Sequence, residues 1–127
     1  MRNPAILYPL FALAPWTLLV LWLIPIARVR SVRQREIAAH DFEFGESAKV
    51  PGRVSLPNRN YMNLLELPIL FYVVGIVLYV TGAASSLAIA IAWAFVALRV
   101  VHSLIHLTYN HVLHRLAAFT LAYVALA

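Results

Sequence analysis

The chain has 127 residues, of which 63% are hydrophobic and 12% are charged, with a formal net charge of +5 and no cysteine. A soluble domain has about 45–50% apolar and about 25% charged residues, so this composition excludes a soluble globular domain and a disordered chain and favours a protein dissolved in lipid. The lack of cysteine excludes disulfides, thiol nucleophiles and cysteine-ligated metal sites.

The first predicted element is an apolar helix near the N-terminus. No charged residue occurs in residues 4–27, and this stretch exceeds the roughly 20 apolar residues that cross a bilayer core about 30 Å thick. A cleaved signal peptide is the alternative, but its apolar region is only about 7–15 residues long. We therefore predict a membrane span over residues 5–27.

Residues 28–60 have a different composition. They contain seven of the ten Lys and Arg residues, four of the five acidic residues and several glycines and prolines. We predict an exposed loop, with a helical stretch over residues 31–39. The positive-inside rule places this loop in the cytoplasm, and with four spans both termini then lie outside the cytoplasm. We expect the membrane to be a bacterial inner membrane. The basic residues then have lipid headgroups rather than nucleic acid as their partner.

The second charge-free stretch, residues 67–98, contains 32 residues. One helix of that length would measure about 48 Å, too long for a single span. The turn-forming residues Thr81, Gly82, Ser85 and Ser86 divide it, and they predict two antiparallel spans over residues 61–80 and 85–107. A fourth span over 111–127 completes an all-α, integral membrane four-helix bundle that forms a single domain.

Two sets of polar residues occupy the cytoplasmic halves of the second and third spans. Within each set the spacing is three or four residues, so its members share one helix face: Arg59, Asn63 and Glu66; Arg99, His102 and His106. The two sets lie at matching depths, roughly 22, 26 and 32 Å from the turn at residues 81–86. We therefore expect three level pairs: Glu66 with Arg99, Asn63 with His102, and Arg59 with His106.

These polar residues have a structural and a functional interpretation. Glu66 and Arg99 can form a buried ion pair that only fixes the helix packing. However, Arg28, Arg30 and Arg115 are expected to reach the same cytoplasmic layer, where too few acids neutralise them. A surplus of arginine at membrane depth favours an anionic ligand.

Four histidines near the third and fourth spans leave a metal or haem site as an alternative. They are His102, His106, His111 and His114. The first two have the spacing of paired metal ligands. No acid lies among the four, Arg99 and Arg115 flank them, and no other span offers a facing histidine for haem. We therefore expect no metal site.

The sequence of residues 59–68, Arg-Asn-Tyr-Met-Asn-Leu-Leu-Glu-Leu-Pro, resembles the second-helix signature R-x3-N-x2-E…P of the MAPEG family, the membrane-associated proteins in eicosanoid and glutathione metabolism. Arg99-Val-Val-His102, followed by Arg115, is similar to the third-to-fourth helix segment of the microsomal glutathione transferases and prostaglandin E synthase. The length, the four spans and the charged first loop also agree with this family.

The resemblance implies a homotrimer that binds glutathione between neighbouring subunits near the cytoplasmic side and acts on lipophilic small molecules. It implies that Arg59, Asn63, Glu66 and His102 hold the tripeptide, together with Arg28 or Arg30 at the end of the first helix. It also implies that Arg115 faces the sulfur. The residue types suit this ligand, because arginines pair bidentately with its two carboxylates and Glu66 can receive an amine.

The sequence departs from the family pattern near the expected position of the sulfur. His106 stands where transferase relatives have a tyrosine, Leu116 replaces a serine and Phe119 replaces a tyrosine. We expect His106 to donate a second hydrogen bond to the sulfur, beside Arg115. Because the departures concern catalysis more than fold, a non-catalytic lipid-binding or scaffold protein remains open beside a glutathione transferase or peroxidase-like enzyme. A histidine-based metal or haem membrane protein is the third alternative.

Overall fold

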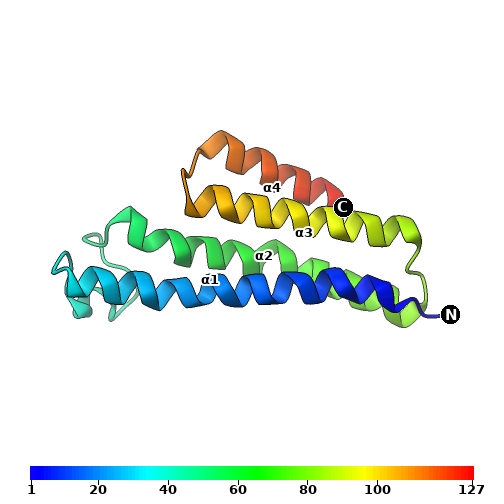
Figure 1. Ribbon diagram of the computed structural model, residues 1–127, viewed down its shortest axis with the longest axis horizontal. Helices are drawn as coiled ribbons and strands as arrows, with labels where there is room; N and C mark the ends of the chain where they lie inside the picture. Colours follow the sequence, from blue (N-terminus) through cyan, green and yellow to red (C-terminus); the bar gives the residue numbers. More distant parts are fainter.

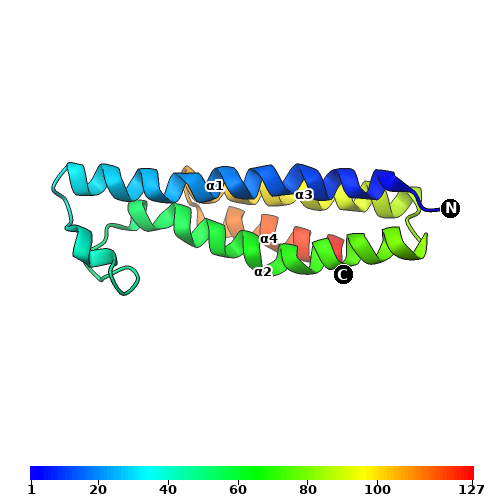
Figure 2. The ribbon, with the colours of Figure 1, turned by 90° about the horizontal axis from the view of Figure 1, so that it is seen from below.

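The computed structural model describes all 127 residues and is entirely helical. Its elements are the 3-10 turn η1 (Pro4–Ile6), α1 (Leu7–Arg33), the 3-10 turn η2 (Ala39–Phe42), α2 (Gly52–Thr81), α3 (Ser86–Leu107) and α4 (Val112–Leu126). The three long helices run along the molecule, and α4 packs mainly against α3, on the side away from α1 (Figures 1 and 2). The predicted all-α fold of four helices is confirmed.

The surface of the bundle is apolar. Only 28 of the 127 residues are buried, and large apolar side chains on all four helices are exposed, such as Phe11, Ile69, Leu87 and Val124. An apolar surface of this extent is incompatible with water but suits the hydrocarbon core of a bilayer. Helices α1, α2 and α3 are long and apolar enough to cross a membrane, whereas α4 is a shorter apolar helix.

Two helices extend beyond the apolar stretches of the sequence. Helix α1 continues to Arg33 and α2 begins at Gly52, so the connection is shorter than the loop expected over 28–60. The helix expected over 31–39 is only the last turn of α1, which ends before Arg35 adopts a left-handed backbone conformation with φ 57°. Charged side chains mark where a membrane span ends, but Arg and Glu are good helix formers, so the helix itself continues.

The predicted turn at residues 81–86 is confirmed and has well-formed caps. Gly82 ends α2 with φ 72°, and the N–H of Ala83 donates to the carbonyl of Leu78 at 3.0 Å. This Schellman arrangement satisfies the last carbonyls of a helix and needs a residue that tolerates positive φ. Ser85 is the N-cap of α3, because its Oγ accepts a hydrogen bond from the backbone N–H of Ala88 at 3.1 Å.

Asp41 organises the connection between α1 and α2. Its carboxylate accepts the N–H of Ala38 at 3.0 Å and the hydroxyl of Ser47 at 2.9 Å. The N–H of Ser47 also donates to the Asp41 carbonyl at 2.9 Å. The hydrogen bonds from Ala38 and Ser47 hold the pKa of the Asp41 carboxyl below its ordinary value of 3.8.

This lowered pKa predicts that the connection loosens in acid. The carboxylate stabilises the folded loop above the unfolded pKa of about 3.9, and this contribution is lost as the pH falls through the lower folded pKa. We expect faster amide exchange at Ala38 and Ser47 in Asp41→Asn than in the parent at neutral pH, and convergence of the two proteins in acid. Glu43→Gln, which changes an exposed acid, is the control. Equal exchange in the parent and in Asp41→Asn at neutral pH would contradict this prediction.

Candidate functional site

A cluster of polar residues is buried in the half of the bundle near the connection between α1 and α2. Its members are 3% exposed or less: Asn60, Arg99, His102, Ser103 and His106. The inner face of α3 is apolar over Ala92, Phe95 and Val96 and becomes polar from Arg99 onward. Polar groups of this kind are costly inside a membrane protein, so they point to a functional region.

Arg99 is fully buried and incompletely paired. Its Nη2 donates to the backbone carbonyl of Asn63 at 2.6 Å, while Nε and Nη1 have no hydrogen-bond partner. The guanidinium also lies 5.6 Å from the centre of the Phe119 ring, within the range of a cation–π interaction. Phe119, one of the departures from the family pattern, therefore contacts the polar cluster.

The expected ion pair between Glu66 and Arg99 is not formed directly within the protomer. The ion pairs present join Arg28 to Glu46 at 3.4 Å and Arg53 to Glu36. Glu66 is exposed because it is one residue, or about 100°, away from buried Leu67 on the helix. Glu66 and Arg99 are thus not in direct contact within the chain.

The two polar sets do lie level with each other. Besides the contact of Arg99 with Asn63, the side chain of Asn60 on α2 donates to Ser103 on α3. Further along the same helices, the rings of Phe71 and Phe95 stack at 4.4 Å. Asn60 and Ser103 were not expected at the site, although Asn60 lies four residues before buried Leu64 and so on the same inner face.

His102 connects α3 to α4 through a backbone group. Its Nδ1 lies 3.0 Å from the carbonyl oxygen of Arg115. Because a carbonyl only accepts, we assign the ring proton to Nδ1, which leaves the lone pair of Nε2 free. Nε2 is buried without a partner. His102 is therefore held by the backbone carbonyl of Arg115, and its second ring nitrogen has no partner in the protein.

Arg115 and His102 line a common cavity of about 240 Å³ between α2, α3 and α4. Asn63 lines it from α2, and the remaining lining residues are Val112, Leu116 and Phe119. The Nη1 of Arg115 donates to the side chain of Asn110 at 2.8 Å, which fixes the guanidinium beside the connection between α3 and α4. The lining includes arginine but no acidic residue, so the cavity suits an anionic ligand.

His106 is placed differently from our expectation. It does not line the cavity, and its ring is buried with both nitrogens unpartnered, 6.0 Å from the centre of the His102 ring. It lies seven residues after Arg99, on the inner face of α3. From there it can support His102, but within the protomer it does not reach a ligand beside Arg115.

The remaining candidate residues do not join the cavity within one protomer. Arg59 and Glu66 are exposed on α2. Arg28 pairs with Glu46 and lies over the ring of Phe42 at 4.8 Å. Arg30 is exposed and has no ion pair. Both of these arginines are on α1, which packs against α2 and α3 and not closely against α4.

The four histidines lie in two separate pairs, His102 with His106 and His111 with His114. No group of three or more His, Cys, Asp or Glu side chains lies close enough to hold a metal ion. The rings of His111 and His114 are 4.4 Å apart, but both residues are exposed in or beside the connection between α3 and α4. Tyr109 lies 3.1 Å from His114 Nδ1 and completes this exposed group.

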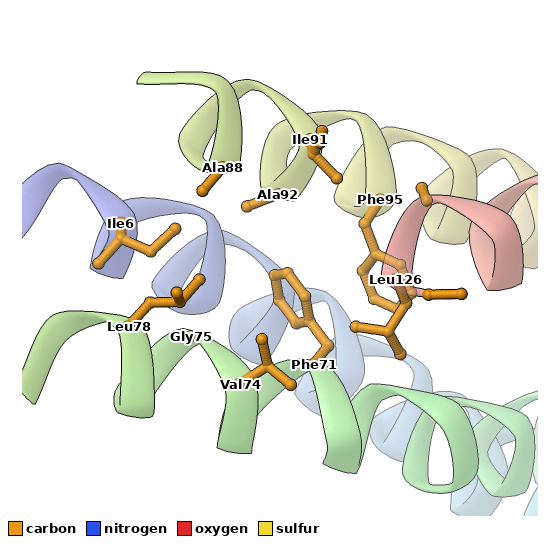
Figure 3. Close-up of a pocket in the computed structure, with 12 residues that line it drawn as sticks. Ile6, Phe71, Val74, Gly75, Leu78, Ala88, Ile91, Ala92, Phe95 and Leu126 are labelled. Carbon is orange, nitrogen blue, oxygen red and sulfur yellow. The ribbon is translucent and has the colours of Figure 1, made fainter. Parts of the chain in front are cut away.

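A second cavity, of about 230 Å³, lies at the opposite end of the bundle (Figure 3). Its side chains come from η1, α2, α3 and α4, and they include Ile6, Phe71, Phe95 and Leu126. It contains no charged residue, so it can hold an apolar group but offers no polar chemistry. The functional candidate is therefore the cavity beside Arg115.

Comparison with known proteins identifies the family of the chain. Residues 6–127 match the family model described as the MAPEG family. Comparisons with curated proteins and with solved structures give no significant match. Since the family match covers essentially the whole chain and the fold consists of apolar helices, the protein is a membrane protein that belongs to the MAPEG family.

Proposed function

We propose that the protein is a glutathione-dependent membrane transferase or peroxidase. It activates the thiolate of glutathione for attack on lipophilic electrophiles or lipid hydroperoxides. Attack of the thiolate on an electrophilic carbon forms a thioether and either expels a leaving group such as chloride or breaks a carbon–carbon π bond, with a proton then added to the second carbon. Reduction of a hydroperoxide yields an alcohol and water while two glutathione molecules form a disulfide. The observation that carries this proposal is the cavity in which Asn63, His102 and Arg115 meet without an acidic residue.

The chemistry of glutathione suits these side chains. The fixed guanidinium of Arg115 stabilises the thiolate, and the free Nε2 of His102 accepts an N–H group of the peptide. Arg59 and Asn63 hold the carboxylates and amides, and Glu66 receives the ammonium group. Charge-assisted hydrogen bonds of this kind are about twice as strong as neutral ones.

A site between subunits would complete this set. Arg59 and Glu66 are exposed on one protomer, and the α1 arginines are remote from its cavity. In a homotrimer the α1 of a neighbouring subunit can bring Arg28 or Arg30 to the ligand held by α2, α3 and α4. We expect the mass of the detergent-solubilised protein, corrected for bound detergent, to correspond to three chains. A strict monomer that still binds glutathione would refute the shared site.

The function is tested with detergent-purified protein, glutathione and chlorodinitrobenzene. Calorimetry should show saturable glutathione binding, and turnover of the electrophile should require both glutathione and the protein. Asn63→Ala should weaken glutathione binding, whereas Asn58→Ala changes an amide that does not line the cavity and should not. Absence of glutathione binding by the parent protein would overturn the proposal.

A non-catalytic lipid-binding function is the second candidate. Leu116 and Phe119 line the cavity at the two positions where relatives carry hydroxyl groups, so fewer donors are available for the sulfur. Binding of glutathione or a lipid without turnover of any electrophile would favour this alternative. Stoichiometric metal in the purified protein would instead favour a histidine-based metal protein.

The proposed orientation places both termini outside the cytoplasm of a bacterial cell. Nine of the ten Lys and Arg residues lie in the half of the bundle opposite to Arg2, and the positive-inside rule assigns that side to the cytoplasm. Reporter fusions at Gly45 and after Ala127 should therefore report opposite compartments. Identical reports from the two fusions would contradict the four-span arrangement.

A further inference from the structure

At one end of the bundle α1 and α2 extend beyond α3 and α4 (Figure 1). A third cavity opens at this end. Its volume is about 410 Å³, and its lining comes mainly from α1 and α2. Leu23, Ile26 and Pro57 line its apolar part. Its polar part is lined by Arg30, Ser31, Gln34, Glu36 and Arg53, and Glu36 pairs with Arg53. The cavity is thus amphipathic, unlike the apolar cavity at the other end.

The same amphipathic order continues along the outer face of α1. A shallow groove there is lined by Trp22, Ile26 and Val29, followed by Arg30 and Arg33. Its three apolar side chains are more than half exposed. Ile26, Arg30 and Gln34 line both the groove and the cavity, so the two form one continuous surface, which we call the α1 crevice.

The α1 crevice contains two guanidiniums without an ion pair, those of Arg30 and Arg33. The neighbouring arginines Arg28 and Arg53 pair with Glu46 and Glu36. Glu36 also accepts the hydroxyl of Ser31 at 2.9 Å. Arg30 lines both parts of the crevice and has no ion pair. The guanidinium of Arg30 is therefore free to bind an anionic ligand.

The spacing along α1 matches half of a bilayer. From Trp22 to Arg33 the helix rises about 16 Å, close to half of a hydrocarbon core about 30 Å thick. Arginine side chains near the end of a membrane helix extend to the headgroups. The apolar part of the crevice therefore lies at the depth of acyl chains and its arginines lie at the depth of phosphates.

We propose that the α1 crevice binds an anionic phospholipid of the leaflet that faces the basic loop. The lipid phosphate lies against Arg30, between Gln34 and Arg53, and an acyl chain lies along Leu23, Ile26 and Val29. Such a lipid joins the end of α1 to the start of α2, two segments that the chain otherwise connects through residues 34–51. Within the chain this site shares no lining residue with the cavity beside Arg115, and with Arg30 on the lipid it is Arg28 that remains for the glutathione site between subunits.

The experiment measures lipid retention after purification from mixed bilayers of phosphatidylglycerol and phosphatidylcholine. Native mass spectrometry should show phosphatidylglycerol retained in preference to phosphatidylcholine, and added inorganic phosphate should not displace it. Arg30→Gln should reduce this preference about tenfold, as expected for the loss of a hydrogen-bonded charge. Arg35→Gln removes the same charge from an exposed residue outside the crevice and should keep the preference.

A second variant keeps the proposal testable if Arg30→Gln does not fold. Ile26→Trp fills the apolar part of the crevice without changing any charge and should also release the lipid. Equal loss in Arg30→Gln and Arg35→Gln would overturn the site, because the attraction would then come from net charge alone. Loss of glutathione binding in Arg30→Gln with unchanged lipid retention would assign Arg30 to the glutathione site and also overturn the proposal.

Discussion

Replacing Arg115 with leucine is expected to raise the pKa of the bound glutathione thiol by about one to three units, the range that a nearby opposite charge produces. A free thiol has a pKa of about 8.5, so only about 3% is thiolate at pH 7. Arg115 lines the cavity and is held there by Asn110. Its loss should therefore lower the thiolate population, and with it the rate of attack, about tenfold or more. Titration of the thiolate absorbance of bound glutathione measures the shift.

Two further variants separate the charge of Arg115 from its geometry. Arg115→Lys keeps the charge and should retain part of the shift. Asn110→Ala removes the acceptor of the 2.8 Å hydrogen bond from Arg115 and should have a smaller effect, because the guanidinium remains but is less fixed. If the thiol pKa is the same in the parent and in Arg115→Leu while glutathione still binds, Arg115 is only an anchor and the mechanism is wrong.

Replacing Glu66 with glutamine is expected to destabilise the protein by about 1 kcal/mol or less, because Glu66 is exposed and forms no direct ion pair with Arg99. Arg99 is fully buried, and its only polar contact is one backbone carbonyl. Any attraction between Glu66 and Arg99 acts over a distance longer than that of an ion pair. The loss of stability should appear as a lower temperature of thermal aggregation in detergent. This temperature is measured by size-exclusion chromatography of the protein that remains soluble after heating.

The matching double variant tests whether the two residues interact. Arg99→Met removes the buried charge, so Glu66→Gln combined with Arg99→Met should be more stable than Glu66→Gln alone. Glu43→Gln changes an exposed acid of the connection and should have no measurable effect. Strictly additive losses would show that Glu66 and Arg99 do not interact.

The polar cluster shows how far the spacing of residues predicts a site. The two polar sets lie level because antiparallel helices that start from one short turn descend at the same 1.5 Å per residue. The spacing of residues along a helix does not specify how that helix is rotated about its axis relative to its neighbours. Neighbouring residues on a helix differ by a rotation of about 100°, which separates exposed Glu66 from buried Leu67. For the same reason the spacing did not indicate that Asn60 and Ser103 face the interior.

The sequence by itself determined the membrane class, the four helices, the turn at residues 81–86 and the family, because these follow from the length of apolar stretches, from turn-forming residues and from short motifs. Only the tertiary structure decided which side chains meet. The helices are apolar on nearly all sides, since lipid covers what the protein does not, and such helices give no periodic signal for their buried face. The packing of α4 on α3, the pairing of Arg28 with Glu46 and the isolation of Arg30 therefore became visible only in the folded chain.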